Sequence, residues 1–153
     1  MILFIITFIL GLAMLAWGIY MLSYRHPSDY DEGTVKIAQS TFLVDLADTM
    51  AKRSQGLSGR EPLKEDEGMY FIFPSSTPQT FWMKDMKFAI DIVWIREGKI
   101  TGVTAEVPPP GNGVSGYELR PSPGPVDAVL EIGSGLAAKL RMGEGDAVTI
   151  KKK

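Results

Sequence analysis

The pattern of apolar and polar positions divides the chain into an uncharged N-terminal run and a longer part of short apolar segments separated by polar turns. Residues 1–24 carry no charged side chain. A helix of about 20 residues crosses a hydrocarbon core of roughly 30 Å. Trp17, Tyr20 and Tyr24 gather towards the end of this run, as aromatic residues do at membrane interfaces. The pattern predicts a single transmembrane anchor. The alternative is a cleaved signal peptide, but the start of the run has no Lys or Arg and its small-residue cleavage site is poor.

Residues 25–33 predict a polar tether, with Pro27 and Gly33 as breakers, and residues 34–153 a domain of their own. Two short helices are expected, over residues 48–55 and 134–142, with Asp48 and Ser134 as candidate N-caps. Short segments rich in β-branched and apolar residues predict strands at residues 34–39, 41–47, 69–73, 80–84, 90–96, 99–107, 126–132 and 147–151. The domain is therefore expected to be mainly β, of the α+β class.

Residues 108–125 interrupt this pattern with six prolines and four glycines. Such a composition predicts a long irregular loop, and long loops in compact domains are often functional. Residues 59–68 and 74–78 are predicted to be shorter loops.

Composition removes several classes of chemistry. The formal net charge of −2 gives no electrostatic footprint for nucleic acid. The absence of cysteine excludes disulfides, thiolate catalysis and zinc–thiolate sites. The one histidine, His26, lies next to the uncharged run, so we expect no metal site and no serine–histidine relay. No cofactor is expected.

Residues 81–95 place charges inside an aromatic and apolar block, where an unpaired buried charge is expensive. One hypothesis is a polar cluster of Lys84 and Asp91 in an aromatic-walled pocket, with Trp82 as its platform. The alternative is an internal Lys84–Asp91 pair that fixes strand register. Alternation places Asp91 on the opposite strand face from its apolar neighbours Ile90 and Ile92.

Two arginines, Arg53 and Arg60, flank Gly56 and Leu57. Two guanidinium groups near one loop could grip a carboxylate or phosphate. The alternative, which we favour, is surface pairing of these arginines with the acids of the following loop, namely Glu61, Asp66 or Glu67.

Glu131 continues the strand predicted over residues 126–132. With Asp91 it could form a carboxylate pair for acid–base work, of the kind that glycoside cleavage requires. The alternative, again favoured, is an outward-facing strand residue.

Six segments occur in a characteristic order along the predicted domain: RSQGLSGR at 53–60, EGMYFIF at 67–73, FWMKDM at 81–86, IDI at 90–92, VLE at 129–131 and GEGD at 143–146. In this order they resemble a family of proteins of unknown function, DUF192, also called UPF0127. The resemblance covers roughly residues 34–150 and implies a compact β-sandwich or barrel-like domain, often exported or membrane-tethered, without an established activity.

These observations predict a membrane-tethered binding or accessory domain, held to the lipid bilayer by residues 1–24. Its recognition surface for a small-molecule or protein ligand would combine the loop at 108–125 with the region of Trp82, Lys84 and Asp91. The alternatives are a hydrolase acting on glycans and a structural domain that docks another protein. The lack of a nucleophile, metal or phosphate-loop motif favours binding over catalysis. Arg25 weakly favours a cytoplasmic domain, whereas the resemblance implies export; we expect the extracytoplasmic side.

Overall fold

The structure, a computed structural model, describes residues 30–111 and 116–153. The anchor predicted over residues 1–24 and residues 25–29 of the tether lie outside this part of the chain. Within the part described, no helix has both the length and the apolar character needed to cross a membrane.

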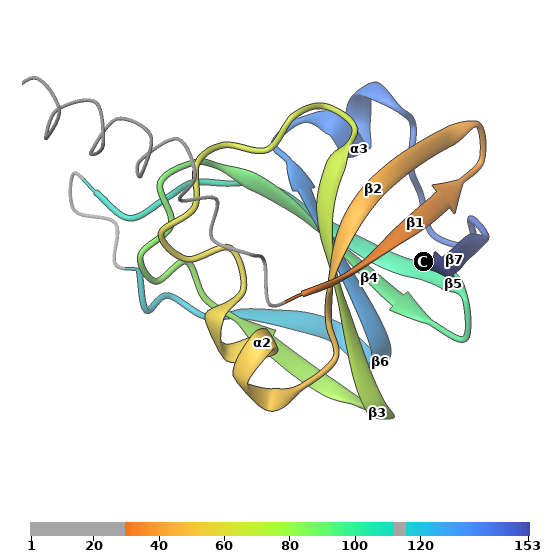
Figure 1. Cartoon of the computed structure of the whole chain (residues 1–153), viewed down its shortest axis with the longest axis horizontal. Coiled ribbons are helices and arrows are strands. Elements are labelled where there is room, and N and C mark those ends of the chain that lie inside the picture. Colours follow the sequence, from red (N-terminus) through yellow and green to blue (C-terminus); the bar gives the residue numbers. More distant parts are fainter. Residues whose placement is uncertain (1–29, 112–115) are drawn as a thin grey trace, which may run out of the picture.

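One seven-stranded mixed sheet and two short helices make up the described residues (Figure 1). The strand order is β5-β4-β6-β3-β2-β1-β7. Neighbouring strands are antiparallel except β2 and β3, which are parallel. The prediction of a mainly β domain is confirmed. The elements are β1 (Asp31–Ile37), β2 (Ser40–Ala47), α2 (Met50–Gln55), β3 (Glu67–Phe81), β4 (Ile90–Arg96), β5 (Lys99–Val107), β6 (Arg120–Gly133), α3 (Leu136–Lys139) and β7 (Val148–Lys152).

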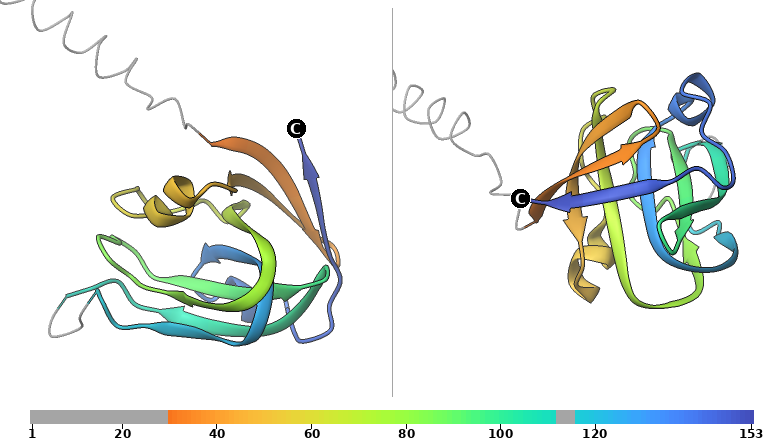
Figure 2. Two further views of the ribbon diagram at one scale, coloured as in Figure 1. Left: turned by 90° about the horizontal axis from the view of Figure 1, so that it is seen from below. Right: turned by 90° about the vertical axis from the view of Figure 1, so that its right-hand side faces the viewer.

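The sheet folds over on itself, so that β1, β2 and β7 face β4, β5 and β6 (Figure 2). Its two edge strands meet at one corner, where Lys99 bridges Ala147. The Val148 amide also donates to the Gly98 carbonyl at 2.8 Å. The sandwich or barrel-like domain that we expected is thus a single rolled sheet.

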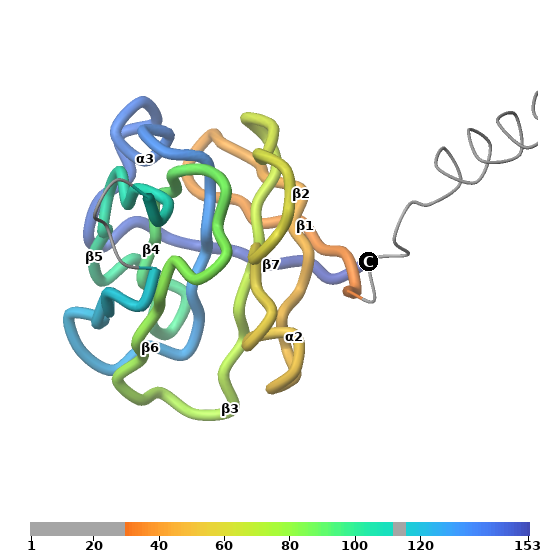
Figure 3. Tube along the Cα trace, turned by 90° about the vertical axis from the view of Figure 1, so that its left-hand side faces the viewer, coloured from red at the N-terminus to blue at the C-terminus, as the bar shows by residue number. Residues whose placement is uncertain are grey.

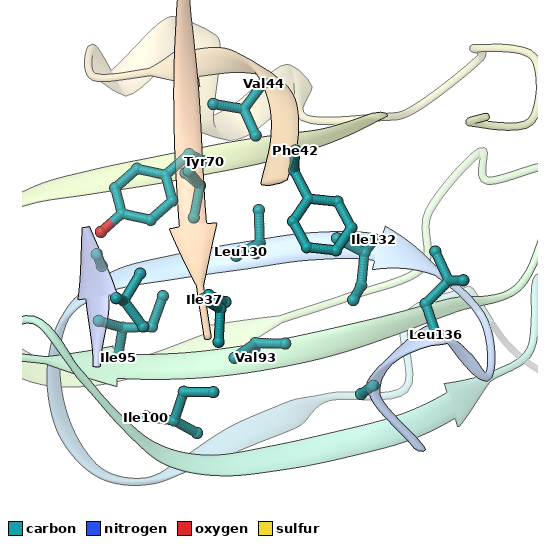
Figure 4. Packing of buried hydrophobic residues seen from close by; sticks show 14 of the residues in the cluster. Ile37, Phe42, Val44, Tyr70, Val93, Ile95, Ile100, Leu130, Ile132 and Leu136 are labelled. Atoms are coloured by element: carbon teal, nitrogen blue, oxygen red, sulfur yellow. The ribbon is translucent and has the colours of Figure 1, made fainter. Parts of the chain in front are cut away.

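The interior of this roll is filled by aliphatic and aromatic side chains from both halves of the sheet (Figure 4). They include Ile37, Phe42, Val44, Tyr70, Val93, Ile95, Ile100, Leu130, Ile132 and Leu136. A second cluster lies on the other face of the central strands and contains Leu57, Met69, Phe71, Met83, Ile92, Trp94 and Val129. The central strands are therefore buried on both faces, which explains the nearly continuous apolar run of β4.

Several boundaries were predicted wrongly. The tether predicted over residues 25–33 ends earlier, because β1 begins at Asp31. The segment expected to form a strand, a loop at 74–78 and a second strand is one strand, β3, with register shifts at Ile72/Thr77 and Pro78/Thr80. Such bulges accommodate residues that a regular ladder rejects. The predicted loop at 108–125 ends earlier, because β6 begins at Arg120. Residues 120–126 of β6 pair with β3 but β4 joins only from residue 128, so prolines without an N–H are tolerated there.

Both helices are shorter than predicted. α2 begins at Met50 and is capped by Thr49, whose hydroxyl accepts the Lys52 amide at 3.2 Å, so the predicted cap Asp48 is wrong. α3 spans one turn and has no side-chain cap of its own, so Ser134 is not its cap. Its N-terminal amides are instead bonded by Asp91, from a distant strand.

Candidate functional site

A pocket of about 290 Å³ lies between α2 with its following loop, β3, and the segment after β3. Figure 3 shows α2 beside β3 at the end of the domain away from α3. β6 contributes one side chain to the pocket, that of Glu131. The volume is near the lower end of the roughly 300–1000 Å³ of small-molecule sites. The lining residues are Met50, Arg53, Ser54, Gln55, Gly56, Leu57, Ser58, Phe71, Phe73, Gln79, Thr80, Phe81, Trp82, Met86 and Glu131.

Aromatic rings form one wall of this pocket. Phe81 makes edge-to-face contacts with Phe71, Phe73 and Trp94, at centroid separations of 4.9, 6.5 and 5.6 Å. Phe71 and Trp94 are almost completely buried. Edge-to-face packing of this kind holds rings in fixed positions, so the wall is preformed and rigid.

Glu131 is the buried acid of this pocket. It lies at the centre of β6, with Met69 of β3 and Ile92 of β4 as its register partners, and is 4% exposed. Among the described residues, no donor bonds its carboxyl and no cation pairs with it. Burial alone raises the pKa of Glu131 from its ordinary 4.5 to about 8. At neutral pH the carboxyl is therefore mainly protonated and can donate a hydrogen bond.

Arg53 supplies a fixed positive charge on the α2 side. Its Nη1 donates to the carbonyls of Asp48 and Ile72 at 2.7 and 2.8 Å. The guanidinium also lies over the Phe73 ring, 5.4 Å from the centroid. No acidic side chain of the described chain pairs with it.

Trp82 lies at the mouth of the pocket, 44% exposed, in edge-to-face contact with Tyr117 at 6.2 Å. Lys84, which we placed beside it, is in an exposed turn and does not line the pocket. Only one member of the predicted Trp82–Lys84–Asp91 cluster therefore belongs to the pocket.

Asp91 has a structural position. Its Oδ1 accepts the backbone N–H groups of Glu106 and Gly135, at 2.8 and 3.0 Å. Its Oδ2 accepts the N–H of Ala137 at 2.8 Å. Three backbone donors satisfy this buried carboxylate, so the predicted Lys84–Asp91 pair is wrong in both its functional and its structural form.

Asp91 and Glu131 do not form a carboxylate pair. Ile92, not Asp91, is the register partner of Glu131, while Asp91 is opposite Ile132. Because successive side chains alternate, the two carboxyl groups project from opposite faces of the sheet. The outward-facing alternative for Glu131 is also wrong, since that face of the sheet is covered by the second cluster. Across residues 30–111 and 116–153, His, Cys, Asp and Glu form no group of three that could hold a metal ion.

Arg60 is separated from Arg53. It forms an ion pair with Asp45 of β2 and lies over the Tyr30 ring, 4.8 Å from the centroid. It lines a second, polar cavity. The favoured prediction of a structural arginine holds for Arg60, but its partner is Asp45 instead of a loop acid.

Sequence reasoning missed the residues that shape the pocket, above all Phe71, Phe81 and Gln79. Phe71 was assigned to a strand buried on both faces, and the alternation of Met69, Phe71 and Phe73 was the available signal for a shared face. Nothing in the sequence places α2 over that face.

Comparison with known proteins agrees with this fold. The model of the family DUF192, described as Uncharacterized ACR, matches residues 33–150. A solved structure from Sinorhizobium meliloti 1021, named as a candidate transcription regulator, is 28% identical with a TM-score of 0.72; the match covers 78% of this chain and 94% of that one. A protein of unknown function from Novosphingobium aromaticivorans DSM 12444 is 31% identical with a TM-score of 0.68, over 81% of this chain and 89% of that one. No curated protein matches at a significant level. The chain belongs to the DUF192 family.

Proposed function

We propose that this protein is a membrane-tethered binding domain that takes up a small, largely apolar molecule in the pocket between α2 and β3. The observation that carries the proposal is Glu131, whose residue is 4% exposed and whose carboxyl has no hydrogen-bond or ion-pair partner among the described residues, in a pocket with an aromatic wall. An unpaired buried carboxyl destabilises a fold, so its place in a concave site supports a role in recognition. The uncharged run at residues 1–24 supports the tether.

The hydrolase alternative loses its basis, because its two carboxyl groups project from opposite faces of the sheet. The protein-docking alternative retains one supporting observation. Met50 and Trp82, on the rim of the pocket, are 81% and 44% exposed, and exposed apolar side chains at a rim are typical of contact surfaces.

Ligand-observed NMR with a library of small ring compounds, on the full chain in lipid nanodiscs, tests the proposal. Two exposed serines provide a matched pair of variants: Ser54 lines the pocket and Ser75 does not. Ser54→Trp should fill the pocket and weaken binding of the compounds found at least tenfold. Ser75→Trp, equally bulky, should leave their Kd unchanged.

Two results would contradict the proposal. Equal binding to the Ser54→Trp variant would place the compounds elsewhere on the molecule. The absence of any bound compound in a broad library would make a protein partner at the Met50–Trp82 rim the better candidate.

A further inference from the structure

The charges at the pocket limit the ligands that it can accept. Of the residues that line it, only Arg53 and Glu131 carry ionisable groups. No ion pair joins these two side chains, and the guanidinium does not lower the pKa of the carboxyl. The pocket therefore presents two separate ionisable groups. The rest of its lining is uncharged and combines the aromatic wall with the polar residues Ser54, Gln55, Ser58, Gln79 and Thr80.

The guanidinium group of Arg53 can bind an anion. Both hydrogen bonds that it makes within the described chain come from Nη1, and they fix the guanidinium plane. A guanidinium has five N–H donors, so those of Nη2 and Nε remain for a ligand. A carboxylate matches this fork in two parallel hydrogen bonds.

The protonated carboxyl of Glu131 can donate a hydrogen bond to an uncharged acceptor. The register partners of Glu131 are Met69 from β3 and Ile92 from β4, and Phe71 and Met86 line the same pocket. None of these four side chains titrates. Arg53, from α2, is the one other charged group at the pocket. In this apolar setting a protonated carboxyl offers its O–H to a carbonyl or ether oxygen, whereas an ionised one would be unpaired.

We propose that the ligand is a small organic acid with a flat apolar body and a second polar group. Its carboxylate binds Arg53, its body packs on Phe71 and Phe81, and an uncharged oxygen accepts a hydrogen bond from the protonated carboxyl of Glu131. This inference rests on the proposed binding function. An organic amine is the opposite class, because the charge of Arg53 repels it and it would bind only with the carboxyl of Glu131 ionised.

Three matched compounds test the class by calorimetry at pH 6 on the full chain in nanodiscs. They are 4-acetylbenzoate, 4-(hydroxymethyl)acetophenone and 4-(aminomethyl)acetophenone, which share a ring and a ketone and differ in the charge of the head group. The acid should bind at least tenfold more tightly than the alcohol, and the amine most weakly. In 4-isopropylbenzoate an isopropyl group replaces the acetyl group and removes the ketone oxygen. Binding should weaken by about five- to tenfold, because the Glu131 O–H loses its acceptor.

Variants of Arg53 and Glu131 test the role of each ionisable group in binding. Arg53→Gln should abolish the preference for the acid, so that the acid and the alcohol bind with about equal affinity. Ser75→Trp, which lies outside the pocket, should leave the preference unchanged. Arg53→Lys should restore part of the preference, since it keeps the charge but loses the fork. In the wild type, affinity for 4-acetylbenzoate should fall between pH 6 and pH 9 as Glu131 ionises. Glu131→Gln should remove this pH dependence.

Equal affinity for acid and alcohol, tighter binding of the amine, or an acid preference that survives Arg53→Gln would each overturn the ligand class. If none of the three compounds binds while other ring compounds do, the class is also wrong but the binding function stands. If no ring compound binds at all, both proposals fail.

Discussion

At the scale of single residues, burial of the Glu131 carboxyl destabilises the fold, and no described residue compensates with a hydrogen bond or an ion pair. Its carboxyl is buried between Met69 and Ile92 and accepts no hydrogen bond from the described residues. Burial favours the neutral form, so the pKa is raised from 4.5 to about 8. Below pH 4.5 both the folded and the unfolded chain keep this proton, and the shift costs nothing.

As the pH rises from 4.5 to 8, the unfolded chain releases the Glu131 proton while the folded chain retains it, so stability is lost across this window. Glu131→Gln should therefore raise the free energy of unfolding at pH 8 by about 2–4 kcal/mol and change it little at pH 4. Urea unfolding at the two pH values measures this difference. Glu144→Gln, at an exposed position, is the matched control and should have no effect. An equal effect of Glu131→Gln at both pH values would contradict a raised pKa.

At the scale of elements, Asp91 explains how a one-turn helix persists. α3 has four residues, far below the length at which an isolated helix is stable. The carboxylate of Asp91, on β4, bonds the amides at its start and also the Glu106 amide of β5. A strand residue thus fixes both a helix and an irregular point of the neighbouring strand.

Asp91→Ala should leave three backbone N–H groups without their acceptor and lower the free energy of unfolding by about 3–5 kcal/mol. Asp146→Ala is the matched control, because Asp146 accepts a single amide, that of Gly143, at 2.9 Å. It should cost about 1 kcal/mol. Denaturant melts followed by tryptophan fluorescence, to which buried Trp94 contributes, compare the two variants. Similar losses for both would show that Asp91 does not hold α3.

The β3 strand shows why some elements were predicted and others were not. The β-branched and apolar residues of β4 and β5 identified these strands with their bounds, residues 90–96 and 99–107. Pro74 and Pro78 suggested a loop because proline removes a ladder hydrogen bond. The chain keeps its strand there through register shifts against β6, a compensation that depends on the partner strand.

At the scale of the whole molecule, the start of the described chain lies against the helix that borders the pocket. Tyr30, the first described residue, donates to the Lys52 carbonyl of α2, the helix that borders the pocket. Only residues 25–29 separate Tyr30 from the uncharged run. Five residues span at most about 18 Å. The tether that we propose would therefore hold α2 close to the membrane surface.

Protease treatment of intact cells tests the proposed topology. With an extracytoplasmic domain, externally added protease should degrade the part of the chain after residue 29 without cell lysis, while a cytoplasmic marker protein stays intact. Protection of the domain until the cells are lysed would reverse the orientation. Recovery of the whole protein from the soluble fraction would contradict the anchor predicted over residues 1–24.

The sequence by itself determined the mainly β class, the family and the faces of individual strands, because alternation and turn residues are local properties of the chain. It placed Asp91 and Ile92 on opposite faces, which the structure confirms. Only the tertiary structure decided which charges meet. Arg60 pairs with Asp45, and Asp91 accepts the amides of α3. Glu131 lies in the pocket that Arg53 also lines but pairs with none of the described residues. Partners of this kind lie up to tens of residues apart, and their meeting depends on strand register and on the rolling of the sheet.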